Sequence, residues 1–150
     1  MAVYLADEQD EPVDTEDLLD LARYVLQAQR VPADMEVALL LVDADTIARL
    51  NRTHLGKEGP TDVLAFPIDE PGETPPDVPA ILGDVVLCPA IAAAQAPGFK
   101  RSAHEELRLL TVHGLLHLLG MDHAEPEEER AMFARTEELL ASHRDEDRAR

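Results

Sequence analysis

The chain has 150 residues, of which 45% are hydrophobic and 29% are charged, a composition that suits one folded domain and excludes general intrinsic disorder. Its only cysteine, Cys88, excludes an intramolecular disulfide and a metal site built from several thiolates, and it favours the reducing cytoplasm. The formal net charge of −18 argues against unaided binding of nucleic acid, because clustered Lys and Arg side chains hold a phosphate backbone, although an acidic composition can also reflect the bias of the host.

The first 30 residues predict a short strand followed by a helix. Residues 2–5 alternate weakly between polar and apolar side chains, which is typical of a short edge strand. The chain turns acidic directly afterwards, so we expect neither an export signal nor a membrane anchor at this end. Apolar side chains then recur at steps of three and four over residues 16–30, which predicts an amphipathic helix with Asp14 or Thr15 as its N-cap.

The next segment predicts a buried strand and a second helix. Met35–Val42 is a continuous aliphatic run with the length of a strand, and we expect it to be covered on both faces of a sheet. Residues 46–54 predict a short helix that follows a cap at Asp43 or Asp45 and ends at Gly56.

Two further strands, a proline-rich loop and a helix are expected in the middle of the chain. Residues 62–67 (DVLAFP) and residues 83–88 (GDVVLC) are compact apolar runs that are typical of strands. Between them, residues 69–79 contain four of the 11 prolines and predict an exposed loop. Residues 89–96 open with proline and predict a helix.

The C-terminal third predicts two helices and completes the fold. Residues 102–119 carry the strongest helical pattern, which ends at Gly120. Residues 127–143 predict a last amphipathic helix, and residues 143–150 are expected to fray because they have no apolar face. The side chains expected to face the core from this last helix are Met132, Phe133, Leu139 and Leu140. The whole pattern predicts a single α+β domain, residues 1–150, in which five or six helices pack against a small mixed sheet of about four strands.

Three histidines in the segment HGLLHLLGMDH, residues 113–123, have the spacing of a metal site. His113 and His117 are four residues apart, so on a helix both imidazoles point to the same side about one turn apart. Gly120 allows the chain to turn back in a left-handed conformation and to bring His123 toward the same ion. Three histidine ligands leave the fourth tetrahedral position of a zinc ion open for water, whose pKa then falls to about 7. The spacing therefore predicts one catalytic zinc ion, although nickel, copper or iron would also bind such a ligand set.

The same histidine spacing occurs in the metzincin protease signature H-E-x-x-H-x-x-G-x-x-H, which makes a peptidase the first alternative. In such proteases the glutamate directly after the first histidine is the general base. Here that position is Gly114, which can neither take nor give a proton. We therefore expect the metal site without the peptidase activity.

The segment HGLLHLLGMDH resembles the H-G-x-L-H-L-x-G-y-D-H signature of the YbeY family of bacterial endoribonucleases. Residues 59–67 (GPTDVLAFP) are similar to the P-T-D/N-V-L-S-F-P stretch of that family. Residues 83–96 (GDVVLCPAIAAAQA) are similar to its G-D-I-x-I-S/C segment and to the helix that follows. Order and spacing agree over residues 36–140, so the likeness covers most of the chain.

The resemblance implies a compact α+β fold and a zinc ion held by His113, His117 and His123. It also implies an endoribonuclease that cuts single-stranded RNA and acts in the maturation and quality control of ribosomal RNA, particularly at the 3′ end of the small-subunit RNA. One position departs from the family pattern, because many members carry an arginine associated with RNA cleavage where this chain has Leu55. Arg52 or Lys57 would then take its place, or the metal alone would meet the phosphate.

We assign candidate catalytic roles to Lys57 and Asp122. Lys57 would meet a phosphate as a point charge, the alternative being a solvated surface lysine. Asp122 would accept a hydrogen bond from a ligand imidazole or act on the bound water, the alternative being a cap of the turn. Asp62 is expected to be a cap or turn residue, and the sequence predicts His54 and His104 at the surface.

Two other function classes stay open for this sequence. One alternative is a zinc hydrolase that acts on another substrate. The other is a ribosome-assembly factor whose metal is structural. The net charge of −18 favours a basic ribosomal protein as a partner, because such a partner supplies the positive charge that this chain lacks. We expect neither DNA nor a membrane as a partner.

Overall fold

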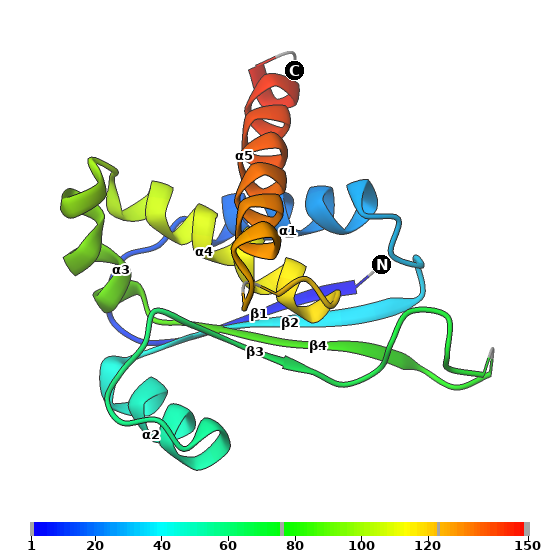
Figure 1. The fold of residues 1–150 in the computed structure, drawn as a ribbon, viewed down its shortest axis with the longest axis horizontal. Helices are drawn as coiled ribbons and strands as arrows, with labels where there is room; N and C mark the ends of the chain where they lie inside the picture. The colour runs from blue at the N-terminus through cyan, green and yellow to red at the C-terminus, as the bar shows by residue number, and fades with distance from the viewer. Residues whose placement is uncertain (1, 76, 123, 149–150) are drawn as a thin grey trace.

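A four-stranded mixed sheet forms the centre of the computed structural model, which describes residues 2–75, 77–122 and 124–148. Its strands are β1 (Ala2–Glu8), β2 (Met35–Val42), β3 (Val63–Pro67) and β4 (Ala80–Leu87). They lie in the spatial order β1-β2-β4-β3, so that β1 and β3 form the two edges (Figure 1). β1, β2 and β4 are parallel, whereas β3 pairs with β4 in the antiparallel direction.

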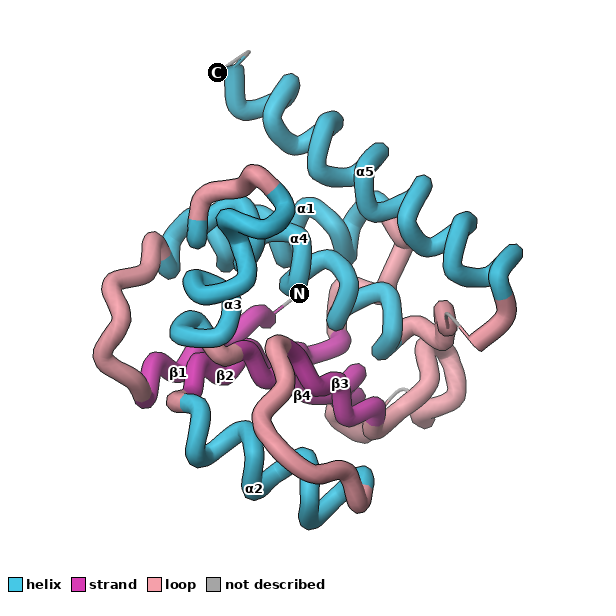
Figure 2. Tube along the Cα trace, turned by 60° about the vertical axis from the view of Figure 1, so that its left-hand side comes forward, coloured by secondary structure: helices cyan, strands magenta, loops and turns pink. Residues whose placement is uncertain are grey.

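The helices lie on both faces of this sheet. One face carries α1 (Thr15–Ala28), α3 (Pro89–Gln95), α4 (Ala103–Leu118) and α5 (Pro126–Arg148). The opposite face carries α2 (Ala44–Leu55), which lies apart from the other helices (Figure 2). A short 3-10 helix, η1 (Ala96–Phe99), follows α3. This arrangement confirms the predicted α+β fold with a small mixed sheet.

None of the described helices is both long enough and apolar enough to span a membrane.

Side-chain caps explain where the main helices begin. Asp14 accepts a hydrogen bond from the Asp17 backbone N–H at 3.2 Å, so it is the N-cap of α1. α2 begins in the same way after Asp43. At the start of α4, Ser102 and Glu105 form a reciprocal capping box, which fixes the helix that carries the predicted metal ligands.

Two apolar layers hold the sheet in place. The larger core lies between the sheet and the helices α1, α4 and α5, and it contains Leu39, Val85 and Leu115 among its fully buried side chains. A smaller core, which includes Ile47 and Cys88, lies between the sheet and α2. The central strands are therefore covered on both faces, as the continuous aliphatic run Met35–Val42 predicts.

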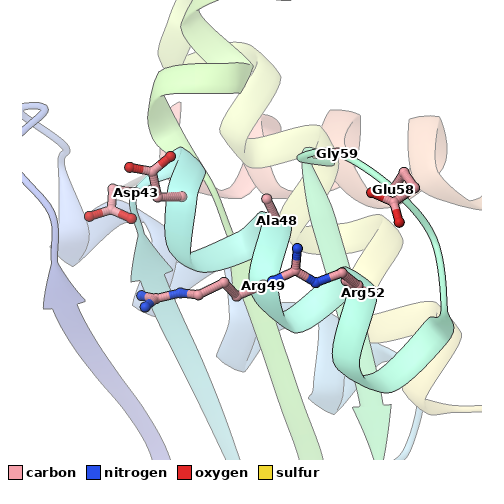
Figure 3. A pocket seen from close by; sticks show the side chains of 7 residues that line it. Asp43, Ala48, Arg49, Arg52, Glu58 and Gly59 are labelled. Atoms are coloured by element: carbon pink, nitrogen blue, oxygen red, sulfur yellow. The ribbon is translucent and has the colours of Figure 1, made fainter.

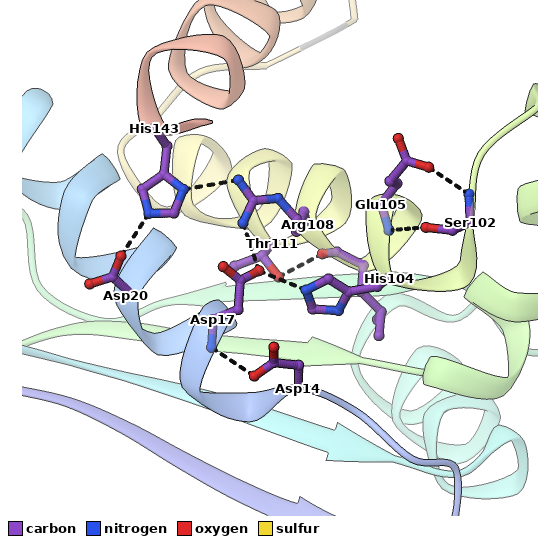
Figure 4. A network of polar contacts seen from close by, with 10 residues as sticks. Asp14, Asp17, Asp20, Ser102, His104, Glu105, Arg108, Thr111 and His143 are labelled. Carbon is purple, nitrogen blue, oxygen red and sulfur yellow. Dashed lines mark hydrogen bonds and ion pairs between the residues drawn. The ribbon is translucent and has the colours of Figure 1, made fainter. Parts of the chain in front are cut away.

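A partly buried polar network ties α1, α4 and α5 together (Figure 4). Asp17 accepts a hydrogen bond from Arg108 Nη1 at 2.6 Å, and His104 Nε2 lies 2.6 Å from the same oxygen. Arg108 also bonds to His143, which in turn bonds to Asp20. Burial raises the pKa of Asp17, but the hydrogen bonds from Arg108 and His104 outweigh it, so that this pKa lies below its ordinary value. His104, which the sequence predicts at the surface, is partly buried in this contact between helices.

The last helix departs from the prediction at two points. Phe133 is half exposed, so the prediction that it faces the core is wrong, whereas Met132, Leu139 and Leu140 are buried as expected. The helix also continues past His143 to Arg148, where the sequence predicts fraying. The reason is that His143 is itself buried and bonded to Arg108 and Asp20, which holds the helix in place at that turn.

Candidate metal and substrate site

His113 and His117 lie on the same side of α4, one turn apart, as their spacing predicts. Their ring centroids are 4.9 Å apart, and the rings meet edge to face at 72°. Both side chains are partly buried and line one cleft of about 460 Å³. Two imidazoles that converge at the wall of a cleft form a pair of ligands suited to a transition metal such as zinc.

The third predicted ligand, His123, lies outside the described residues. Within the described part of the chain, no group of three potential ligands gathers around one point. The chain turns directly after α4, where Gly120 has a φ of 94° and its N–H donates to the His117 carbonyl at 3.0 Å. This left-handed turn is the conformation that the predicted site requires after the second histidine. The two described histidines are therefore compatible with a transition metal, and the full ligand set stays a prediction.

Gly114 faces the sheet, where it leaves no room for a side chain. A Cβ atom at this position would lie 2.6 Å from Val85 Cγ1 and 3.3 Å from Val63 Cγ2. A glutamate at position 114 would therefore push α4 away from β3 and β4. This packing gives a physical reason why the peptidase general base is missing here.

Lys57 lines the same cleft as the two histidines. It follows Gly56, which ends α2 with a φ of 67°, and its backbone N–H donates to the Asn51 carbonyl at 3.3 Å. The buried Asn51 side chain donates in turn to the Gly59 carbonyl at 3.0 Å. These bonds hold the loop after α2 at the mouth of the cleft.

Asn51 is a site residue that the sequence analysis does not identify. It lines the cleft and bonds to the loop that carries Lys57. Its signal in the sequence is a polar residue four positions after Ile47, on the side of the helix that faces the core. A buried amide at such a position needs hydrogen-bond partners, and the loop supplies one.

Leu55, where many members of the resembled family have arginine, also lines the cleft and is half exposed. Arg52 lines a different hollow of about 490 Å³ together with Arg49 (Figure 3). The acidic side chains in that hollow are Asp43, Asp45 and Glu58. Three carboxylates against two guanidiniums give no excess of positive charge, so Lys57 is better placed than Arg52 to meet a phosphate in the histidine cleft.

The remaining predicted residues take different positions. Asp62 lies just before β3, lines the histidine cleft and accepts a hydrogen bond from Gln95 Nε2 at 2.9 Å. Asp122 is exposed in the turn after α4, and the described lining of the cleft does not include it. His54 is exposed, as predicted, and packs edge-on against Phe66 with ring centroids 5.2 Å apart.

Comparisons with known proteins agree over almost the whole chain. The family model described as endoribonuclease YbeY matches residues 4–144. Proteins named endoribonuclease YbeY from Salinispora tropica and Acidothermus cellulolyticus are each 52% identical to it, covering 96% of this chain and 97% and 92% of their own lengths. A solution structure of a Thermotoga maritima protein has a TM-score of 0.60 and 27% identity, and the match covers 96% of this chain and 93% of that one.

Proposed function

The chain belongs to the endoribonuclease YbeY family, and on that premise we propose that it cuts single-stranded RNA in the cleft lined by α4, β3 and the end of α2, with one zinc ion held by His113, His117 and His123. The observation that carries the proposal is the edge-to-face approach of His113 and His117 in a cleft that Lys57 also lines. We propose ribosomal RNA in the cytoplasm as the substrate, processed at the 3′ end of the small-subunit RNA.

The all-imidazole ligand set supports zinc as the metal. A zinc ion in this cleft would supply Lewis-acid chemistry to a phosphodiester. The protein would hold the two described histidines on a rigid helix. The capping box at Ser102 and the close packing at Gly114 fix that helix in place. A ligand pair on such a helix needs little rearrangement when the ion binds.

Lys57 supplies positive charge to the lining of the cleft. Its ammonium group would bind a nonbridging phosphate oxygen, and would so orient the scissile bond toward the histidines. Asn51 positions this lysine through the loop that it holds. Asp122 would orient a ligand imidazole or accept a proton, and its exposed place in the turn after α4 leaves it accessible to solvent.

The overall charge of the chain favours a substrate that is presented by a partner. With a net charge of −18, the surface repels RNA at long range, so binding relies on the cleft. A basic ribosomal protein beside the RNA would offset this repulsion. This supports ribosome-associated RNA as the substrate, with neither DNA nor a membrane as a partner.

The test combines metal analysis with RNA cleavage. Purified protein should contain about one equivalent of zinc and should cut a labelled single-stranded RNA but not its duplex. His113→Ala and His117→Ala should lose both the zinc and the cleavage. His54→Ala is the matched control, because His54 is an exposed histidine that packs against Phe66, and it should keep both. Full cleavage by a metal-free sample would falsify the proposed mechanism.

A further inference from the structure

A second pocket, of about 360 Å³, opens beside the histidine cleft. His113, Asp62 and Val63 line both spaces, so the pocket and the cleft lie next to each other. Its volume lies within the range of roughly 300–1,000 Å³ that is usual for small-molecule sites. The proposed role of the cleft leaves this neighbouring space unexplained.

Glu106 provides a polar group for a ligand in this pocket. The residue lines the pocket and is only 2% exposed. Its Oε1 atom lies 3.3 Å from Arg101 Nη1, whereas Oε2 has no hydrogen-bond partner among the described residues. A buried acceptor without a partner is costly, and an N–H donor on a ligand would remove that cost.

Two aromatic side chains border the same pocket and are exposed. Phe99 is 61% exposed and Phe133 is 50% exposed, although both are large apolar residues. The Arg101 guanidinium lies 5.2 Å from the centre of the Phe99 ring. Exposed aromatic rings and a stacked arginine are the groups on which unpaired nucleobases stack in proteins that bind single strands.

Charge decides which part of an RNA strand fits each space. Asp62 and Glu106 place two carboxylates at the pocket against the single cation Arg101, so a phosphate group is disfavoured there. The neutral base of a nucleotide carries no such penalty. The histidine cleft, where Lys57 offsets the charge of Asp62, suits the phosphate better.

Building on the proposed function, we infer that this pocket binds one unpaired guanine base, next to the phosphate that lies in the histidine cleft. Guanine is the standard base that has a ring N–H and an amino N–H side by side on one edge, the pair of donors that a carboxylate accepts. Arg101 beside Glu106 would donate to the O6 atom of guanine. Uracil presents a single N–H between two carbonyl oxygens. A carboxylate repels these oxygens, because both carry partial negative charge.

The first experiment measures binding without cleavage. Fluorescein-labelled 2′-O-methyl RNA pentamers that differ only in one central base are titrated with zinc-loaded protein, and anisotropy gives the Kd of each. The guanine pentamer should bind about tenfold more tightly than the uracil pentamer, as expected for one well-paired base. Equal affinities, or tighter binding of any other base, would overturn the inference.

Three variants test whether the preference for guanine arises in this pocket. Glu106→Gln should reduce the preference for guanine over uracil to about twofold or less, because the amide removes the charged acceptor. Glu128→Gln, an exposed change on α5, is the matched control and should keep the preference. Phe133→Ala should weaken the binding of every pentamer about tenfold, because it removes a stacking surface. Since Phe133 is half exposed, its loss should leave the fold intact even if Glu106→Gln does not.

The same oligonucleotides separate this inference from the proposed function. A preference for guanine in binding, together with no cleavage of the matching 2′-hydroxyl RNA, would support the pocket and overturn the nuclease proposal. Cleavage with no preference among the four bases would support the nuclease and overturn the pocket.

Discussion

Arg108 lies 2.9 Å from His143, measured from Nη2 to Nδ1. Because a guanidinium can only donate, Nδ1 must be the acceptor, and the ring proton is therefore on Nε2. That nitrogen lies 2.8 Å from Asp20 Oδ2, to which it donates. One arginine on α4 thus selects the histidine tautomer that binds α5 to α1 (Figure 4).

Replacement of Arg108 should destabilise the whole helical layer. Arg108→Leu removes the guanidinium that bonds to both Asp17 and His143. The side chains of Arg108 and Asp17 are only 10% and 21% exposed, so water replaces this partner poorly. The free energy of unfolding should fall by about 2–4 kcal/mol, measured by urea denaturation. Arg135→Leu is the control, because Arg135 pairs with the exposed Glu138, and it should cost about 1 kcal/mol or less. Equal losses for the two variants would contradict this role.

Asp17 should make stability depend on acid. Its pKa lies below the ordinary value of 3.8, because the hydrogen bonds from Arg108 and His104 outweigh the effect of burial. A lowered carboxyl pKa contributes stability that is full above the unfolded value and is lost as the pH falls through the folded value. Asp17→Asn should therefore be less stable than wild type at pH 7, and the difference should shrink as the pH falls below 3.8.

Urea denaturation of both proteins between pH 7 and pH 2.5, about one unit below the usual carboxyl range, measures this difference. Asp10→Asn, at an exposed position outside the network, should follow the wild type across the whole range. A difference between wild type and Asp17→Asn that stays constant down to the lowest pH would contradict the prediction.

Removal of the Lys57 charge should impair RNA cleavage more than folding. Lys57→Ala should lower kcat/KM on single-stranded RNA by about tenfold or more, because a positive charge next to the scissile phosphate is lost. The slope of log kcat/KM against log salt should become shallower by about 0.7, the value for one phosphate contact on a single strand. Arg52→Ala, in the neighbouring hollow, should stay within about threefold of wild type. Equal effects of the two variants would show that Lys57 has no special role in binding the phosphate.

Gly114→Ala should weaken the packing of α4 on the sheet. The added Cβ would lie 2.6 Å from Val85 Cγ1, so the strand or the helix must move. We expect a loss of about 1–3 kcal/mol in unfolding free energy. Thermal denaturation against Gly98→Ala gives the comparison, since a Cβ at Gly98 has no atom within 4 Å. Gly114→Ala with the stability of wild type would show that the sheet can adjust.

The sequence by itself determined the elements of this protein and the histidine pair on one side of α4. Helix and strand periods, together with caps such as Asp43 and Gly56, act over a few residues, so they can be read from the chain directly. The spacing of His113 and His117 fixed their shared helix face for the same reason.

Only the tertiary structure decided which distant residues share a space. Packing of α4 on β3 and β4, and the bond from Asn51 to the loop after α2, place Lys57 in the cleft of the two histidines. The exposed position of Phe133 likewise depends on how α5 crosses α4, which no local period encodes. Such contacts join segments far apart in the chain, and their geometry follows from how whole elements pack.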